Sequence, residues 1–206
     1  MKLSNNLFLI QKQTEVLVNH DSETDWEFSV QKDGELEAFF LVLNQNLNIK
    51  VLLQGEKAKS NIKCVYLSNE NNNLNINIQV IHEYKNTTSN QQVKGFSTGE
   101  SIVSLTAGIE IPKNTDGCEG FQNHRGILLS DKAKIMVTPQ LEIWSEDVVC
   151  SHGSAVGPLP EEEVFYLETR GLKKQSAEKL LLSSFFNDIV PSEFDTYIGE
   201  WMDQNV

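Results

Sequence analysis

Apolar and polar residues alternate along much of the chain, which is the pattern of strands with one buried face. The alternation is clean in residues 47–51 and 74–80. Further strands are predicted at 62–67, 101–105, 127–129 and 134–137. Turn residues separate these segments, and we place turns at Gly55, 69–73, 94–95, 98–99, 107–108 and 116–117. The chain from Leu36 to about Ile143 is therefore predicted to be a long β region.

No helical periodicity interrupts this β region, and a doubly wound α/β fold is excluded because parallel strands of that kind need helical crossovers. Two all-β architectures remain: a sandwich, and a β-helix in which each strand stacks on the previous turn of a coil. Asn-rich stretches such as 69–73 favour the coil, because stacked Asn side chains can form ladders. A general bias toward Asn explains those stretches equally well.

A helical tail is predicted after residues 157–160, where Gly and Pro end the alternation. One helix begins at Glu161 and stops at Gly171, a second covers Lys174–Ile189, and a third covers Glu193–Met202. Their apolar faces are broad, so we expect them to pack against the end of the β region, to dock another protein, or both. We divide the chain into a core, residues 1–158, and a helical region, residues 159–206.

Composition limits the function classes. The chain has 206 residues, of which 39% are hydrophobic, and a net charge of −12, which argues against nucleic acid and anionic membranes as partners. Three cysteines without a Cys-x-x-Cys pair predict neither a disulfide scaffold nor a self-contained zinc site. With no signal-peptide core and no membrane-spanning window, we expect a reduced, cytoplasmic protein.

Residues 138–153 read as a strand that ends in a thiol and an imidazole, Cys150 and His152. Alternation places both side chains on one face, where they could share a metal ion. Two donors are too few for a metal site, so the others must come from elsewhere in the fold or from a second subunit. By spacing alone, a buried cysteine beside a hydrogen-bonded histidine is the simpler interpretation.

Other residues capable of chemistry carry weaker signals. His124 precedes a predicted strand and is a candidate metal ligand, although an exposed turn histidine is the simpler interpretation. Cys118 lies in a turn-like context that predicts accessibility, and Cys64 alternates within an apolar strand and is predicted to be core. Phosphate-loop, dinucleotide, nucleophile-elbow and His-Glu-x-x-His motifs are missing from the sequence, which argues against a self-sufficient enzyme.

Several stretches resemble the SufB/SufD family of iron–sulfur cluster assembly proteins, with SufD as the more similar branch. They are Pro139–Ile143, Glu146–Gly153, Phe165–Leu167 and Thr169–Leu172, with Thr115–Gly117 and Asn123–Asp131 upstream. The similarity covers about residues 80–190, and the first 75 or so residues match the family only in their general residue pattern. We expect a short form that lacks the family's N-terminal helical region.

The resemblance implies a right-handed parallel β-helix, a single-stranded solenoid, followed by a small C-terminal helical subdomain. It implies a scaffold subunit rather than an enzyme. The expected partners are a SufC-like ATPase, docked by the helices, and either a SufB-like subunit or a second copy of this chain. A transient iron–sulfur cluster would form at that subunit interface, in a bacterial cytosol or a plastid-type compartment.

Within the resemblance, the family's role at the cluster site falls on His152, with Cys150 as the less certain neighbour. His124 occupies the position where SufB carries a cysteine, so the SufB-type thiol is missing here. A different class of function remains open: a metal-free β-helix adaptor that only stabilises the ATPase complex. A metal-dependent β-helix hydrolase finds no acid–base residues to support it.

Overall fold

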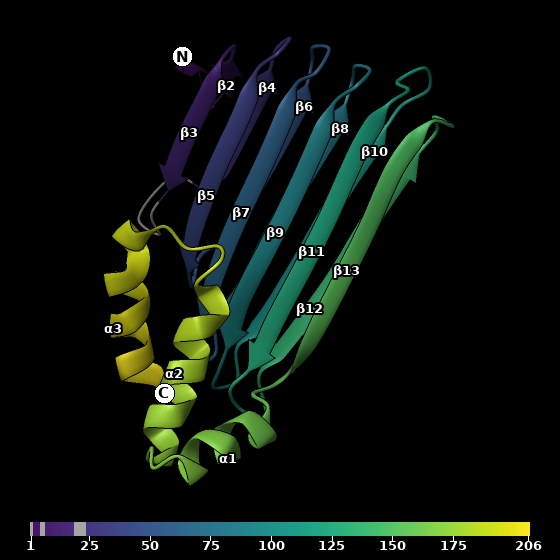
Figure 1. Cartoon of the computed structure of the whole chain (residues 1–206). Coiled ribbons are helices and arrows are strands. Elements are labelled where there is room, and N and C mark those ends of the chain that lie inside the picture. Colours follow the sequence, from purple (N-terminus) through teal and green to yellow (C-terminus); the bar gives the residue numbers. More distant parts are fainter. Residues whose placement is uncertain (1, 5–6, 19–23) are drawn as a thin grey trace.

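The computed structural model describes residues 2–4, 7–18 and 24–206, and shows two facing β-sheets with helices at the C-terminal end (Figure 1). One sheet, called the even-numbered sheet although β1 lies at its edge, holds in spatial order β1 (Lys2–Ser4), β2 (Leu7–Ile10), β4 (Asp25–Val30), β6 (Leu47–Leu53), β8 (Asn73–His82), β10 (Ile102–Ile111) and β12 (Lys134–Ile143). The odd-numbered sheet holds β3 (Gln13–Val18), β5 (Glu35–Leu43), β7 (Lys59–Ser68), β9 (Thr88–Ser97), β11 (Cys118–Leu128) and β13 (Val148–Pro158).

Strands that are next-but-one in sequence pair in parallel, apart from the antiparallel pair β1 and β2. Ile102 of β10, for example, aligns with Asn73 of β8 on one side and with Lys134 of β12 on the other. The chain thus crosses from one sheet to the other and returns one layer further on. This winding is consistent with the expected β-helix-like core, while its right-handed sense stays an expectation.

The interior between the sheets is filled by the inward side of each strand. Phe28, Phe40 and Tyr66 are fully buried there, together with aliphatic side chains from both sheets. On the outside, the amide of Asn90 donates to Asn61 Oδ1 at 3.1 Å, and Asn61 donates to Glu37 at 2.7 Å. Polar ladders of the expected kind are therefore present along the coil.

Two predicted turns, at 94–95 and at 107–108, were wrong, because both lie inside strands. Gly95 is required inside β9 because a Cβ atom there would meet the ring of Tyr66 at 2.4 Å. The glycine that suggested a turn in fact marks a close approach between stacked strands. The other predicted turns lie between strands, as expected.

The predicted single strand over 138–153 is two strands joined by a turn. The first, β12, ends at Ile143, and β13 then runs from Val148 to Pro158. Cys150 and His152 consequently lie in the first half of β13 and not at a strand end. The division of the chain between residues 158 and 159 coincides with the end of β13 but stays a prediction as a domain boundary.

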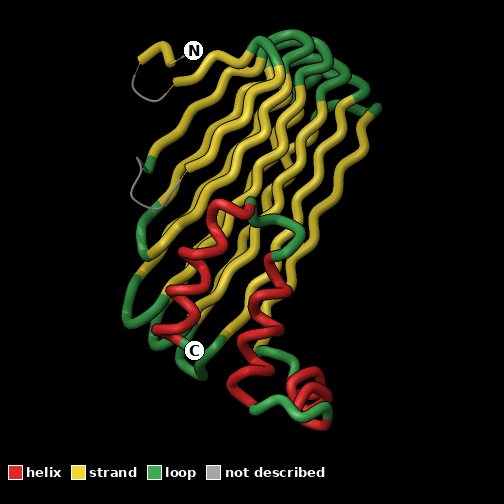
Figure 2. The backbone as a smooth tube through the Cα atoms, turned by 60° about the vertical axis from the view of Figure 1, so that its left-hand side comes forward, coloured by secondary structure: helices red, strands yellow, loops and turns green. Residues whose placement is uncertain are grey.

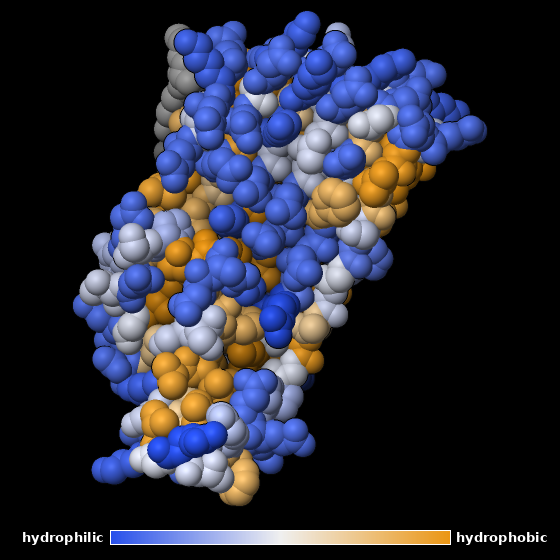
Figure 3. All heavy atoms as spheres, viewed as in Figure 1, coloured by the Kyte–Doolittle hydropathy of each residue, from blue (hydrophilic) through white to orange (hydrophobic). Residues whose placement is uncertain are grey.

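The tail forms α1 (Glu161–Thr169), α2 (Lys174–Phe186), a 3-10 turn (Ser192–Phe194) and α3 (Asp195–Asn205), which confirms the predicted helices. The second and third helices and the 3-10 turn lie over the outer face of the odd-numbered sheet, whereas α1 lies near the end of the strands (Figures 1 and 2). Phe96 of β9 packs on Phe186 with ring centroids 4.5 Å apart, and Lys94 Nζ donates to the Phe185 carbonyl at 2.8 Å. Figure 3 shows apolar surface where helices and sheet meet.

Candidate functional site

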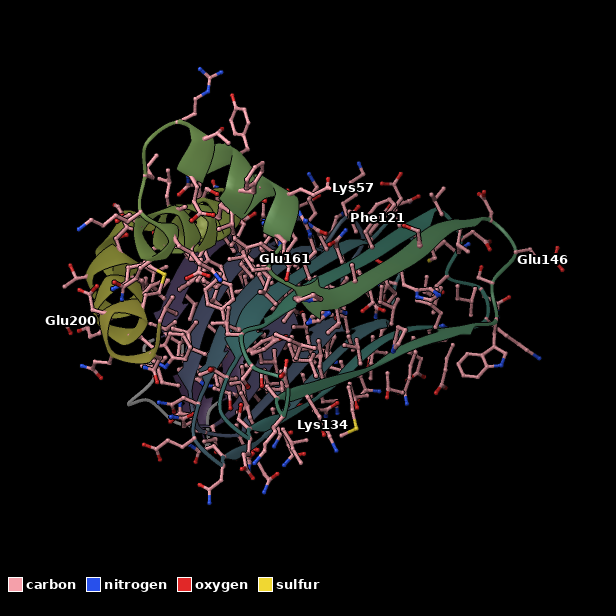
Figure 4. The ribbon with its side chains drawn as sticks, turned by 90° about the horizontal axis from the view of Figure 1, so that it is seen from below. Lys57, Phe121, Lys134, Glu146, Glu161 and Glu200 are labelled. Carbon is pink, nitrogen blue, oxygen red and sulfur yellow. The ribbon has the colours of Figure 1, made fainter. Side chains whose placement is uncertain are left out.

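The last turn of the coil leaves one end of the molecule open. Within the described residues, β12 pairs only with β10, and β13 pairs only with β11. Side chains that would be interior in any earlier turn, such as Ile135, Val137 and Leu141, are only half-buried here. In Figure 4, Phe121 and Lys134 project outward from the two opposite sheets, so their sequence neighbours face the interior between them. The open end therefore exposes two strand edges and part of the core.

Cys150 and His152 lie on the inward face of β13 at this open end. Cys150 aligns with Gly120 of β11, and His152 aligns with Gln122. The Cys150 Sγ atom lies 3.4 Å from the position that a Cβ on Gly120 would occupy, so the thiol packs where Gly120 leaves space. The thiol is half-buried, whereas the imidazole of His152 is exposed. The two donors share one face, as their spacing predicts.

The Cys150 thiol is held in its protonated form. Partial burial raises its pKa above the ordinary value, the neighbouring Cys118 adds to the rise, and a hydrogen bond from the Gly120 backbone opposes it. A metal ion that binds this sulfur must therefore displace a proton. Any metal binding at this sulfur would therefore carry a free-energy cost that increases as the pH falls.

Cys118 is buried, which corrects the prediction that it is accessible. It begins β11 with only 1% of its surface exposed. Its Sγ atom lies 3.2 Å from Thr87 Oγ1 and donates to the Tyr84 carbonyl at 3.3 Å. Cys64 is fully buried, as predicted, and burial raises its pKa to about 12. These two thiols belong to the core.

His124 is also buried, so the interpretation as an exposed turn histidine was wrong. Its Nε2 atom lies 2.9 Å from Tyr66 Oη, and its Nδ1 atom lies 3.2 Å from Ser154 Oγ. Burial lowers its pKa to about 4, which keeps the imidazole neutral at physiological pH. Its role as a metal ligand stays a prediction, and it would require one of these two hydrogen bonds to break.

Replacing Tyr66 by Phe is expected to lower the free energy of unfolding by about 1–3 kcal/mol, because the buried His124 Nε2 loses its partner. Chemical denaturation at neutral pH measures the change. The exposed Tyr84 is the matched control, and its change to Phe should stay within about 0.5 kcal/mol of the wild type. Equal stability of the two variants would contradict the account of the Tyr66–His124 pair.

Across the described ranges, no three His, Cys, Asp or Glu side chains converge on a point that could hold a metal ion. Cys150 and His152 thus form an incomplete donor set within this chain. Sequence reasoning missed Gln122 beside His152, and Tyr66 and Ser154 beside His124. The inward residues of β11 are largely polar or glycine, so this strand carries no apolar alternation by which to find them.

A second surface feature is a groove of about 850 Å³ between α1, α2 and the ends of β11 and β13. Apolar residues, including Val164 and Leu182, lie among its lining, and so do the acidic side chains of Glu161, Glu168 and Glu178. In the described part of the chain, no helix has the length and apolar content needed to cross a membrane.

Comparison with known proteins decides the family. The chain matches the SUF system FeS cluster assembly family, SufBD core domain, over residues 8–185. The chain belongs to this family. The match reaches further toward the N-terminus than the residues that first suggested the resemblance, so the early coil turns are also family-like.

Relatives come from bacteria and from plastid-bearing organisms. They include the iron-sulfur cluster assembly protein SufD of Escherichia coli, 26% identical over 67% of this chain, and the chloroplastic protein ABCI7 of Arabidopsis thaliana, 25% identical over 84%. The SufBD family protein ycf24 of Galdieria sulphuraria is 25% identical over 69% of this chain and 66% of its own length. The chain spans 33% of the E. coli SufD protein and 35% of ABCI7.

Proposed function

We propose that this chain is a SufD-like scaffold subunit in iron–sulfur cluster assembly and has no enzymatic reaction of its own. The cluster is then its cargo, built at a subunit interface. The observation that carries the proposal is the open end of the coil, where Cys150 and His152, on the inward face of the last turn, form an incomplete donor set. Membership in the SufBD core-domain family supports it.

The open edges of β12 and β13 supply the surface for the partner. Ten residues of β12 and eleven of β13 present backbone groups with no neighbouring strand in the described chain. Such edges pair readily with strands of another protein. We propose a SufB-like subunit, or a second copy of this chain, in that place. Its side chains would add the donors that Cys150 and His152 lack.

The groove beside α1 and α2 is proposed to receive a SufC-like ATPase. Exposed Phe165 of α1 lines the groove among its acidic residues, and Tyr166 is exposed next to it in the sequence. The whole chain carries a net charge of −12. Aromatic anchors within a charged rim are common in protein interfaces. A partner that presents a basic, partly apolar surface would complement this face.

The test is anaerobic reconstitution of the complex with iron and sulfide, followed by cluster absorbance. His152→Ala is expected to reduce cluster formation at least about tenfold, the loss of roughly 1.4 kcal/mol of binding, while the partners still co-purify. Cys150→Ala should reduce it less, because its protonated thiol is the poorer donor. Ser151→Ala is the matched control, since Ser151 is exposed on the opposite face of β13.

The metal-free adaptor is the alternative. The raised pKa of the Cys150 thiol favours it, because a protonated thiol binds metal poorly. Equal cluster absorbance from complexes with and without Cys150 and His152 would establish the adaptor role and overturn the cluster site. Failure of SufB-like and SufC-like proteins to co-purify with the wild-type chain would overturn the scaffold role itself.

A further inference from the structure

Two buried glutamines lie directly behind His152 inside the coil. Gln91 of β9 aligns with Gln122 of β11, and Gln122 aligns with His152 of β13. The three side chains point into the interior from successive turns, about 4.8 Å apart along the stack. Gln91 is 1% exposed and Gln122 is 6% exposed. An amide column therefore leads from the core to the open end.

Three polar atoms of this column have no hydrogen-bond partner within the described chain. They are Gln91 Oε1, Gln122 Oε1 and Gln122 Nε2. Leaving buried amide groups unpaired is costly, and native proteins seldom tolerate it. The adjoining cavity has a volume of about 10 Å³, which holds at most one water molecule.

One contact fixes the direction in which the amides can pair. Gln91 Nε2 donates to the Gly108 carbonyl at 3.0 Å, and a carbonyl can only accept. The Oε1 atom of Gln91 is therefore free to accept from the Nε2 of Gln122, its neighbour in register. That pairing leaves Gln122 Oε1 on the side of His152, as an acceptor for a ring N–H. Stacked amides of this kind form ladders along parallel strands.

We propose that Gln91 and Gln122 form a hydrogen-bonded column that positions the imidazole of His152. Rotation about side-chain bonds is enough to close it, because the three residues already share a face and a register. The hydrogen bond to Gln122 holds the proton on one ring nitrogen of His152. The other nitrogen then keeps its lone pair free at the open end of the coil.

In this arrangement Gln122 is a positioning residue that orients His152. That a metal ion or nascent cluster is what the free nitrogen receives rests on the proposed function. The hydrogen-bonded column does not rest on it, since the column follows from register, burial and the unpaired amide atoms. The two claims are consequently tested separately.

The test is the tautomer of His152, read from long-range ¹H–¹⁵N correlation spectra of the full chain labelled at histidine, without metal, at a pH where the ring is neutral. His152→Ala identifies the His152 signals by their disappearance. One tautomer is expected to dominate in the wild type. Gln122→Met, which keeps side-chain volume but removes the amide, should reduce that preference roughly 2- to 10-fold, the range for the loss of one net hydrogen bond.

Gln91→Met should weaken the preference less, because Gln122 keeps its place but loses the group that orients it. Gln140→Met, on the exposed outer side of β12, should change nothing. The His124 signals serve as an internal check that the interior is still folded. An unchanged tautomer ratio in folded Gln122→Met overturns the proposal. If that variant does not fold, an unchanged ratio in Gln91→Met overturns it instead.

The outcome is independent of cluster assembly. If the tautomer ratio is unchanged in Gln122→Met, the column is overturned, but the reconstitution result for His152→Ala still tests the cluster site. If Gln122→Met loses the tautomer preference while His152→Ala still forms the full amount of cluster, the hydrogen-bonded column would be supported and the cluster site at His152 overturned.

Discussion

Acidification from pH 6.5 to 4.5 is expected to lower the free energy of unfolding by about 4 kcal/mol, about 2 kcal/mol for each of two buried histidines. The two are His82 and His124, and burial lowers the pKa of each to about 4. His82 is fully buried between Thr87 Oγ1 and Ser89 Oγ, each 2.8 Å from a ring nitrogen. Both rings are buried, so a charged ring there would lose most of its hydration.

The direction follows from which state binds the proton. In the unfolded chain both histidines titrate near pH 6.5, whereas in the folded chain they stay neutral down to about pH 4. Between these values the unfolded state binds more protons, so stability falls as the pH falls. The loss is largely complete at pH 4, where the folded state also begins to take up protons.

Denaturant titrations at several pH values measure this dependence. Carboxylates also titrate near its lower end, so the histidine contribution is isolated by variants. His82→Gln and His124→Gln cannot ionise, and each should remove about half of the loss between pH 6.5 and 4.5, whatever it does to stability at pH 7. If the free energy of unfolding of both variants falls with pH as steeply as that of the wild type, the two imidazoles must become hydrated and charged in the folded protein.

Phe96→Ala is expected to lower the free energy of unfolding by about 3–5 kcal/mol. Phe96 is fully buried on the outer side of β9, and its ring contacts those of Phe185, Phe186 and Trp201, with centroids 4.5 to 6.3 Å apart. Truncation leaves a cavity where the tail meets the sheet. The tail should loosen before the coil does, because the interior on the other side of β9 is untouched.

Chemical denaturation gives the size of the effect, and limited proteolysis between β13 and α3 shows where it acts. Leu180→Ala on α2 is the matched control, because Leu180 is 50% exposed and does not line the groove, so its loss should cost less than about 0.5 kcal/mol. If the helices dock the ATPase, Phe96→Ala should also weaken co-purification of the SufC-like partner. Uniform proteolysis of coil and tail would contradict a separately docked tail.

Much of the secondary structure could be read from local pattern. The alternation in β6 and β8, and the helical spacing in α2, depend only on residues close in sequence, which is why they were predicted well. β9 was missed and β11 was recognised only at its end, because their inward positions hold Gln, His and Gly instead of apolar residues. Alternation detects a strand only when its buried face is apolar.

The sequence by itself determined that Cys150 and His152 share a face, because side chains in any extended strand alternate with period two. It also determined a β region followed by three helices. Only the tertiary structure decided which residues surround Cys150 and His152. Burial of Cys118 and His124, the column from Gln91 to His152, and the open last turn all depend on the register between strands separated by a full turn of the coil. That register is set by packing between distant residues, which no local pattern records.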